Sequence, residues 1–290
     1  LAGGPLQQDR LLRLHTPLGP DVLVAETLDG VESVDGGGFR FELTALSVDA
    51  HLSLDRLLGE PVLLQWQTDG SNGTAGAHGG NAIQGMLDSA QAVRPLHGHV
   101  TRCERVGSNG GLARYRLRLQ PWLAFLGQRV DSYVFHDASV VDIVENVFAD
   151  YSGLVPAWRW DLTDRSLYAK RSLTTQYQET DLAFVQRLLA EEGIYYWFEH
   201  ADDPGSESFG AHTQVLADNH HGARDLGTVR FHRGDVTERD DSVQQWSTAR
   251  RWCTTKVSRH TWDHRTLELR QASGTLKAED LQSINALLQK

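Results

Sequence analysis

The spacing of apolar residues changes along this 290-residue chain, from a period of two to a period near 3.6 and back again. Residues 114–119 read Arg-Tyr-Arg-Leu-Arg-Leu, so the tyrosine and both leucines share one face and three arginines share the other. Because successive side chains of a strand point to opposite sides, this alternation predicts a half-buried strand. Residues 39–43 alternate in the same way, and residues 61–66 and 96–106 are predicted as further strands.

The helical period begins in the middle of the chain. Over residues 139–151 apolar side chains recur at intervals of three and four, which predicts a helix with one buried face. Either Asp137 or Ser139 can cap the start of this helix, since both side chains accept hydrogen bonds from backbone N–H groups.

A second helix is predicted over residues 181–192, with Thr180 as its N-cap. Gly193 stands where a left-handed residue commonly follows a helix. Residues 194–198 (Ile-Tyr-Tyr-Trp-Phe) come next and predict a strand that is covered on both faces, because they are bulky and apolar throughout.

Short strands return in the last third of the chain, which gives the order strands, helices, strands. They are predicted over residues 213–216, 228–232, 243–252, 256–262 and 267–270. The glycine-rich residues 69–80 predict a long hairpin insertion, since glycine resists regular structure. Residues 276–290 have the apolar spacing of a short helix.

Composition excludes several classes of function. The formal net charge is −10 and the isoelectric point is about 5.7. We expect no nucleic-acid partner, because phosphate binding needs cationic surface. No apolar run approaches the roughly 18 residues of a membrane-spanning helix, so no stable membrane insertion is expected. Cys103 and Cys253 lack CxxC-type neighbours, which predicts two buried, reduced thiols, with a disulfide as the alternative.

Side chains that could carry chemistry are present, but they form no recognisable motif. Among 13 histidines, His97 and His99 share a face of a predicted strand, yet no HExxH or cysteine pair accompanies them. Glu191 and Glu192 are adjacent on a predicted helix and diverge, so we expect them in solvent or paired with arginine of another copy. We therefore predict that the chain is not an enzyme, binds no metal and needs no cofactor.

Two long motifs carry a family resemblance. The first contains Gly-Leu-Ala-Arg-Tyr-Arg-Leu, Pro-Trp-Leu-Ala-Phe-Leu and Phe-His-Asp-Ala-Ser-Val-Val-Asp-Ile-Val within residues 111–144. The second, residues 176–198, runs from Gln-Tyr-Gln-Glu-Thr-Asp through Leu-Leu-Ala-Glu-Glu-Gly to Ile-Tyr-Tyr-Trp-Phe. Together with residues 12–19 and 52–62, they resemble the N-terminal, phage-hub-like (GPD-like) region of VgrG, the spike family of bacterial type VI secretion systems.

The resemblance implies a β-rich α+β fold like the baseplate hub of contractile phages, with two similar β-barrels flanking a small helical part. The first barrel would span residues 1–126 with a hairpin insertion near 67–93. The middle helical domain would be 127–193, the second barrel 194–272 and a helical tail 273–290. Three chains of two barrels each would present an approximate sixfold face, which lets a trimer stack on a hexamer.

The implied function is the structural base of a trimeric secretion spike that docks on the hexameric Hcp tube and carries a puncturing needle and effectors into target cells. The implied partners are two further copies, the Hcp hexamer, effector or adaptor proteins and baseplate components. Assembly would be cytoplasmic, followed by secretion or injection. The alternatives are the hub of a contractile phage tail or injection particle and, from another class, a cell-wall hydrolase. Because the chain begins with Leu1, we expect it to be part of a longer protein.

Arg114, Arg116 and Arg118 are the candidate interface residues. Their shared strand face is either solvated or, at an oligomer contact, paired with carboxylates of a partner. The sequence leaves both possibilities open.

Overall fold

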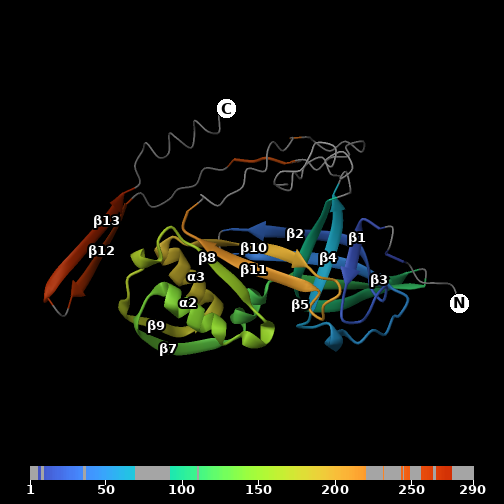
Figure 1. Cartoon of the computed structure of the whole chain (residues 1–290), viewed down its shortest axis with the longest axis horizontal. Coiled ribbons are helices and arrows are strands. Elements are labelled where there is room, and N and C mark those ends of the chain that lie inside the picture. Colours follow the sequence, from blue (N-terminus) through green and yellow to red (C-terminus); the bar gives the residue numbers. More distant parts are fainter. Residues whose placement is uncertain are drawn as a thin grey trace, which may run out of the picture. The chain divides into compact units, whose positions relative to one another are not determined.

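The structure is a computed structural model that describes residues 6–7, 10–34, 37–68, 92–109, 111–219, 231, 243, 245–248, 256–263 and 266–275. The chain divides into two compact units (Figure 1). The first contains Leu1–Thr228 and Arg239–Asp241, and the second contains Val229–Glu238 and Ser242–Lys290. The predicted glycine-rich insertion, the predicted C-terminal helix and Cys253 lie outside the described residues.

A curled six-stranded antiparallel sheet dominates the first unit, in the order β1-β4-β5-β6-β3-β2 (Figure 1). Its strands are β1 (Leu12–His15), β2 (Val24–Ser33), β3 (Gly38–Ser47), β4 (Pro61–Thr68), β5 (Ala92–Asn109) and β6 (Leu112–Gln120), with the 3-10 helix η1 (Leu54–Arg56) before β4. Bulges in the β2–β3 and β5–β6 pairs bend these strands and increase their twist. The strands predicted in the first 120 residues are confirmed.

The inner face of this sheet forms the first hydrophobic core. On β6 the side chains of Tyr115, Leu117 and Leu119 are buried, while the arginines between them are not. Leu43 of β3 and Leu64 of β4 are also fully buried in this core. Each fully buried leucine contributes about 1.5–3 kcal/mol relative to an exposed one, so this face supplies much of the stability of the sheet.

Two helices follow, and both begin as predicted. Helix α2 (Val140–Ala149) starts with a capping box in which the Ser139 side chain accepts from the Asp142 N–H and the Asp142 side chain accepts from the Ser139 N–H. Helix α3 (Asp181–Glu192) is capped by Thr180 and ends at Gly193, whose φ of 73° is left-handed. None of the described helices is long and apolar enough to cross a bilayer.

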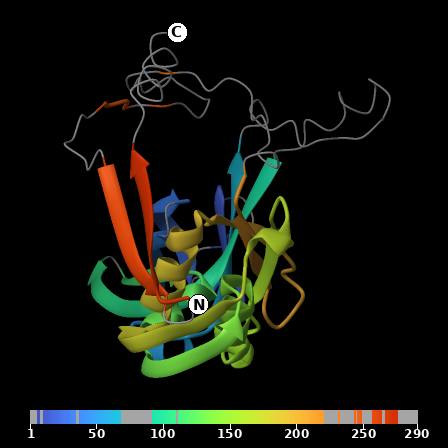
Figure 2. The same ribbon diagram turned by 90° about the vertical axis from the view of Figure 1, so that its left-hand side faces the viewer.

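The helices pack against strands to form a second core in the same unit. Figures 1 and 2 show them beside the antiparallel pair β7 (Val130–Ala138) and β9 (Arg171–Thr180). A three-stranded sheet, β10-β11-β8, completes this part. Its strands are β8 (Ala157–Asp161), β10 (Tyr195–Asp202) and β11 (Gly210–Ala217), and the connecting 3-10 helices are η2 (Trp122–Gly127), η3 (Ser152–Leu154) and η4 (Arg165–Leu167). The core contains Trp122, Phe148, Phe184, Leu188 and Tyr196.

The prediction that residues 194–198 are covered on both faces is wrong. Strand β10 lies at the edge of its sheet, and Tyr196 is buried while Tyr195, Trp197 and Phe198 are only half-buried. Aromatic residues tolerate this position because their large rings can be partly covered by neighbours while one side stays in water.

In the second unit, β12 (Lys256–Asp263) and β13 (Glu268–Thr275) form an antiparallel hairpin. Both strands lie where the sequence predicts them, although β13 begins after Leu267, whose φ of 58° is left-handed. Phe231 and Val243 form an isolated parallel bridge. From residue 194 onward the described residues form β10 and β11 of the three-stranded sheet, the Phe231–Val243 bridge and the β12–β13 hairpin, so the pair of similar barrels stays a prediction.

A buried carboxylate joins the elements around α3. Asp181 is inaccessible to solvent, and its Oδ2 accepts from Arg129 Nε at 2.6 Å and from Tyr151 Oη at 2.6 Å. Its Oδ1 accepts from Gln176 Nε2 at 2.7 Å. A buried charge is costly unless it is fully hydrogen-bonded, so this network fixes the start of α3 against β7, β9 and the end of α2.

We expect Asp181→Asn to lower the free energy of unfolding by about 2–3 kcal/mol, because two donors would then face a neutral amide. Asp150→Asn is the matched control: Asp150 also bonds Arg129, at 2.7 Å, but its side chain is 52% exposed. The Asp150→Asn variant should lower the free energy of unfolding by less than about 1 kcal/mol. Urea unfolding followed by tryptophan fluorescence measures both, and equal losses for the two variants would contradict the assigned role of Asp181.

Candidate functional site

The three candidate arginines lie on the outer face of β6, and each pairs with a glutamate of its own chain. Arg114 bonds Glu26 of β2 through Nε and Nη2, at 2.9 and 2.8 Å. Arg118 bonds Glu42 of β3 at 2.6 Å, and Arg116 bonds Glu104 of β5 at 3.0 Å. These pairs, which we call the charged ladder, cross the outer face of the sheet from β2 to β5.

One carboxylate of the charged ladder serves two guanidinium groups. Glu104 accepts from Arg102 Nη2 at 2.9 Å as well as from Arg116, and hydrogen bonding from Arg102 is the main cause that lowers its pKa. A hollow of about 230 Å³ at this point is lined by Glu42, Arg102, Glu104, Arg116 and Arg118. Three arginines against two glutamates give the lining a formal charge of +1 (3 − 2).

The sequence left open whether these arginines are solvated or pair at an oligomer contact. The structure brings all three together with carboxylates of their own chain, an arrangement that the sequence did not identify. Such exposed pairs contribute little to stability, typically about 0–1 kcal/mol each. Their side chains remain 31–48% exposed, so a contact role stays a prediction.

Four histidines meet where the six-stranded sheet contacts the β10–β11 pair, and we call this group the histidine junction. It consists of His97 and His99 of β5, His200 of β10 and His212 of β11. The ring of Phe39 lies 5.1 Å from that of His200 and 5.7 Å from that of His212. The sequence indicated the shared face of His97 and His99 but did not single out His200.

Short hydrogen bonds connect the junction to the backbone. His97 Nδ1 and His212 Nδ1 are 2.8 Å apart, and His97 Nε2 lies 2.8 Å from the Ser208 carbonyl oxygen. The backbone N–H of Trp122 donates to His212 Nε2 at 2.8 Å. His200 Nδ1 lies 3.2 Å from the backbone nitrogen of His97 and 3.1 Å from its carbonyl oxygen, and the tautomer of His200 decides which of the two it bonds. These contacts join β5, β11, η2 and the loop between β10 and β11.

Burial favours the neutral imidazole at every position of the junction. It lowers the pKa of His99 and of His200 to about 4, and it also lowers the pKa of His97 and, well below its usual value, the pKa of His212. The described residues contain no group of three or more side chains arranged to hold a metal ion. The hydrogen bonds of the histidine junction connect the six-stranded sheet with β10 and β11.

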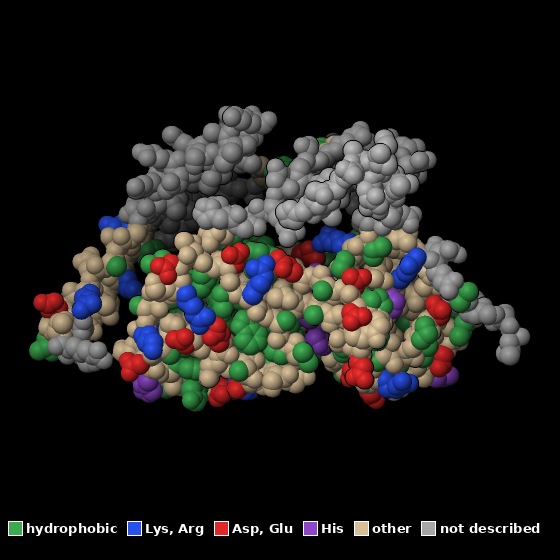
Figure 3. Space-filling view, in the orientation of Figure 1, with side chains coloured by type: hydrophobic (Ala, Val, Ile, Leu, Met, Phe, Trp, Pro, Cys, Tyr) green, Lys and Arg blue, Asp and Glu red, His purple; other side chains and the backbone are tan. Residues whose placement is uncertain are grey.

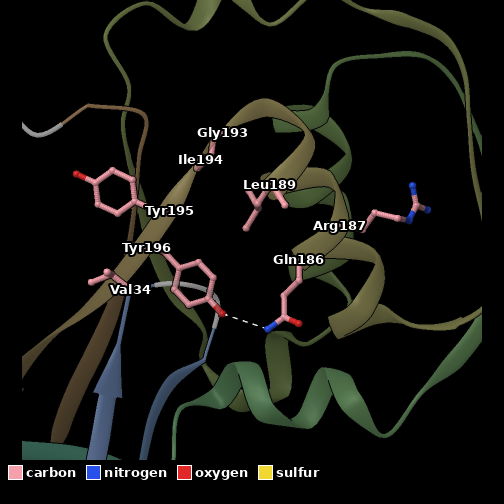
Figure 4. A pocket seen from close by; sticks show the side chains of 9 residues that line it. Val34, Gln186, Arg187, Leu189, Gly193, Ile194, Tyr195 and Tyr196 are labelled. Atoms are coloured by element: carbon pink, nitrogen blue, oxygen red, sulfur yellow. Dashed lines mark hydrogen bonds between the residues drawn. The ribbon is translucent and has the colours of Figure 1, made fainter. Parts of the chain in front are cut away.

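A pocket of about 550 Å³ lies between α3, the start of β10 and the residue that follows β2 (Figure 4). Its wall is mainly apolar, and the Gln186 amide donates to Tyr196 Oη at 3.4 Å. In Figure 4 Arg187 points away from the two tyrosines. The described lining residues are Val34, Gln186, Arg187, Leu189, Ala190, Gly193, Ile194, Tyr195 and Tyr196, a set without a carboxylate, histidine, serine or cysteine.

Glu191 and Glu192 are neither free in solvent nor convergent on a substrate. Arg171 of β9 bonds both, through Nη1 to Glu191 Oε2 at 2.7 Å and through Nη2 to Glu192 Oε1. Cys103 is a free thiol and is only partly buried, where the sequence predicted burial. Its Sγ donates to the Leu54 carbonyl at 3.4 Å, and burial raises its pKa.

Comparison with known proteins identifies the family to which this chain belongs. The sequence profile of the phage tail baseplate hub (GPD) matches residues 32–286. The type VI secretion spike protein VgrG1b of Pseudomonas aeruginosa is 32% identical over 264 residues, which are 89% of this chain and 31% of that protein. VgrG1a of the same organism is 33% identical over 213 residues, 71% of this chain and 29% of that protein. The chain thus spans less than a third of either relative.

A solved structure agrees with this assignment at the level of the fold. The c3393 protein of E. coli, a component of the type VI secretion system, superposes with a TM-score of 0.56 at 22% identity, covering 76% of this chain and 52% of that one. The match includes the β-rich architecture described above. This chain belongs to the phage tail baseplate hub (GPD) family and resembles, within it, the hub-like region of the type VI secretion spike proteins VgrG.

Proposed function

We propose that this chain is the structural base of a trimeric type VI secretion spike that docks on the hexameric Hcp tube. The observation that carries the proposal is the match to VgrG spike proteins over 89% of the chain. A threefold assembly of a chain with two similar barrels would present the approximate sixfold face that a hexameric ring requires. We keep the barrel limits expected above, residues 1–126 and 194–272, as part of the proposal.

The charged ladder supplies a means of setting the register of such an assembly. Rows of paired arginine and glutamate on a sheet are held at fixed spacing by the strands, so they favour one alignment of a partner over others. At Glu104, two guanidinium groups share one carboxylate. The excess positive charge there favours a carboxylate from another chain, with Arg114, Arg116 and Arg118 as the contact residues.

The proposed role is mechanical, without catalysis. Acid–base or nucleophilic chemistry usually relies on carboxylate, histidine, serine or cysteine side chains that converge in a cleft, and the described lining of the 550 Å³ pocket contains none of these four types. The proposal extends to the partners of a spike, namely effector or adaptor proteins and baseplate components. It places assembly in the cytoplasm before secretion or injection, with the needle and effectors travelling on the same particle.

A second candidate is the hub of a contractile phage tail or a related injection particle, which the family profile itself favours. The two candidates share a fold and differ in the tube protein they contact. Binding to a phage tail-tube ring in place of Hcp would therefore decide for the phage hub.

The direct test mixes the purified chain with Hcp hexamers and examines the mixture by electron microscopy. We expect threefold rings stacked on one end of the hexamer, with a mass by light scattering that fits three chains per ring. The chain staying monomeric and apart from Hcp, with a phage tube protein bound instead, would overturn the type VI assignment.

Reversing the charge of the three arginines of the charged ladder tests whether they are contact residues. We expect the triple variant Arg114→Glu, Arg116→Glu, Arg118→Glu to lose at least tenfold in Hcp affinity or trimer formation, because like charges would then oppose the partner. The variant Arg159→Glu, Arg165→Glu, Arg187→Glu changes the net charge equally on other elements and serves as the control. Equal behaviour of both variants in pull-down and light scattering would reject the ladder as the interface.

Substitutions in the exposed pairs of the charged ladder should change the free energy of unfolding only slightly. A loss of binding can then be told apart from a loss of folding. Arg118→Glu should lower the free energy of unfolding by about 1 kcal/mol, since it places a second acid beside Glu42 on a partly exposed face. Adding Glu42→Arg should recover most of that loss, as a double-mutant cycle would measure. Absence of any coupling would mean that the pair does not form in solution.

A further inference from the structure

The histidine junction has a definite arrangement of protons, which follows from its backbone contacts. Because the Trp122 N–H donates to His212 Nε2, that nitrogen carries no hydrogen, and a neutral His212 must carry its hydrogen on Nδ1. His212 Nδ1 then donates to His97 Nδ1, 2.8 Å away. His97 in turn carries its hydrogen on Nε2 and donates to the Ser208 carbonyl at 2.8 Å. Three hydrogen bonds thus run in one direction from η2 to the β10–β11 loop.

This chain of hydrogen bonds has no place for another proton. A proton added to His212 Nε2 would face the Trp122 N–H, and a proton added to His97 Nδ1 would face the hydrogen of His212. In either case a hydrogen bond becomes a contact between two donors, inside a site where an unsatisfied polar group is costly.

The charged neighbours of the junction do not compensate the positive charge of an imidazolium. The other histidines and Arg94 of β5 oppose protonation, whereas the Ser208 carbonyl at His97 and the His97 carbonyl at His200 favour it. Burial outweighs these two carbonyl contacts, because the pKa of every ring is lowered. Phe39 of β3 and Phe125 of η2 add only uncharged rings. Carboxylates on strands beside the junction bond other groups: Glu32 of β2 bonds Arg94, Asp202 of β10 bonds Gln65 of β4, and Glu199 of β10 bonds Arg159.

Further buried polar atoms in this part have no protein partner: His99 Nδ1, Trp122 Nε1 and both amide atoms of Gln214. Gln214 is completely buried and stands two residues after His212 on β11. In a region that already contains unpaired buried polar groups, each further hydrogen bond that is lost lowers the stability of the contact again. The junction is consequently a weak point between the two sheets once its rings are charged.

We propose that the histidine junction is an acid-sensitive latch that fastens the β10–β11 pair to the six-stranded sheet and releases when its imidazoles take up protons. Above pH 6.5 the histidines are neutral in both the closed and the open state, so the latch has its full strength. As the pH falls below 6.5, an opened, solvated imidazole binds a proton while the closed one does not. The latch weakens through this window, down to about pH 4, where His99 and His200 titrate in place.

The Trp122 amide reports the latch directly, because its hydrogen is bonded to His212. We expect its hydrogen-exchange protection, corrected for the intrinsic pH dependence of exchange, to fall about tenfold per pH unit for each imidazole that ionises on opening, from pH 6.5 downward. Amide exchange of the whole 290-residue chain, followed by mass spectrometry or NMR between pH 7.5 and 4.5, measures this slope. Protection at Trp122 that stays constant over this range would overturn the proposal.

Two variants separate the latch from general acid sensitivity. His212→Gln offers an acceptor oxygen to the Trp122 N–H but binds no proton, so the slope should decrease by about one proton. His136→Gln, on the exposed part of β7, should leave the slope unchanged. If His212→Gln does not fold, imidazole ¹⁵N shifts of the unmodified chain decide: the latch requires an unprotonated His212 Nε2 at pH 6, and a doubly protonated His212 with Trp122 still protected contradicts it.

Discussion

The inner face of the six-stranded sheet is stabilised by burial of alternate side chains, and strand β6 shows how this constraint reaches the surface. Successive side chains of a strand point to opposite faces. Because Tyr115, Leu117 and Leu119 are buried on the inner face, the three arginines between them lie on the outer face. The core and the proposed contact surface are therefore two sides of one strand. A register shift by one residue would bury the arginines and expose the core, so the position of the charged ladder is as firmly set as the core itself.

Polar groups, in contrast, connect the parts of the first unit. Asp181 ties α3 to the elements around it through three charged or neutral donors, and the histidine junction ties the six-stranded sheet to β10 and β11. Buried polar contacts of this kind need every partner in place, which makes them specific about geometry and vulnerable to change. The Asp181 network holds one charge fully bonded, whereas the junction depends on rings that stay neutral.

The described face of the molecule in Figure 3 mixes charges of both signs. The antiparallel sheet is continuous from β1 to β2, and Figure 3 shows acidic and basic side chains interspersed on one face of the molecule, with no large field of one sign. Such a surface favours alignment by local pairs over long-range attraction, since opposite charges in close mixture cancel at a distance.

The sequence by itself determined the local elements. The start of α2 follows from Ser139, and both limits of α3 follow from Thr180 and Gly193, because caps act within a few residues. The two faces of β6 follow from a period of two. Only the tertiary structure decided which residues far apart in the sequence come into contact. Arg114 pairs with Glu26, 88 residues earlier, and His97 meets His212, 115 residues later. The wrong prediction that residues 194–198 are covered on both faces has the same origin, because the sequence does not show that β10 lies at the edge of its sheet. Spacing along a chain fixes which side chains share a face, but strand order and sheet packing decide what that face touches.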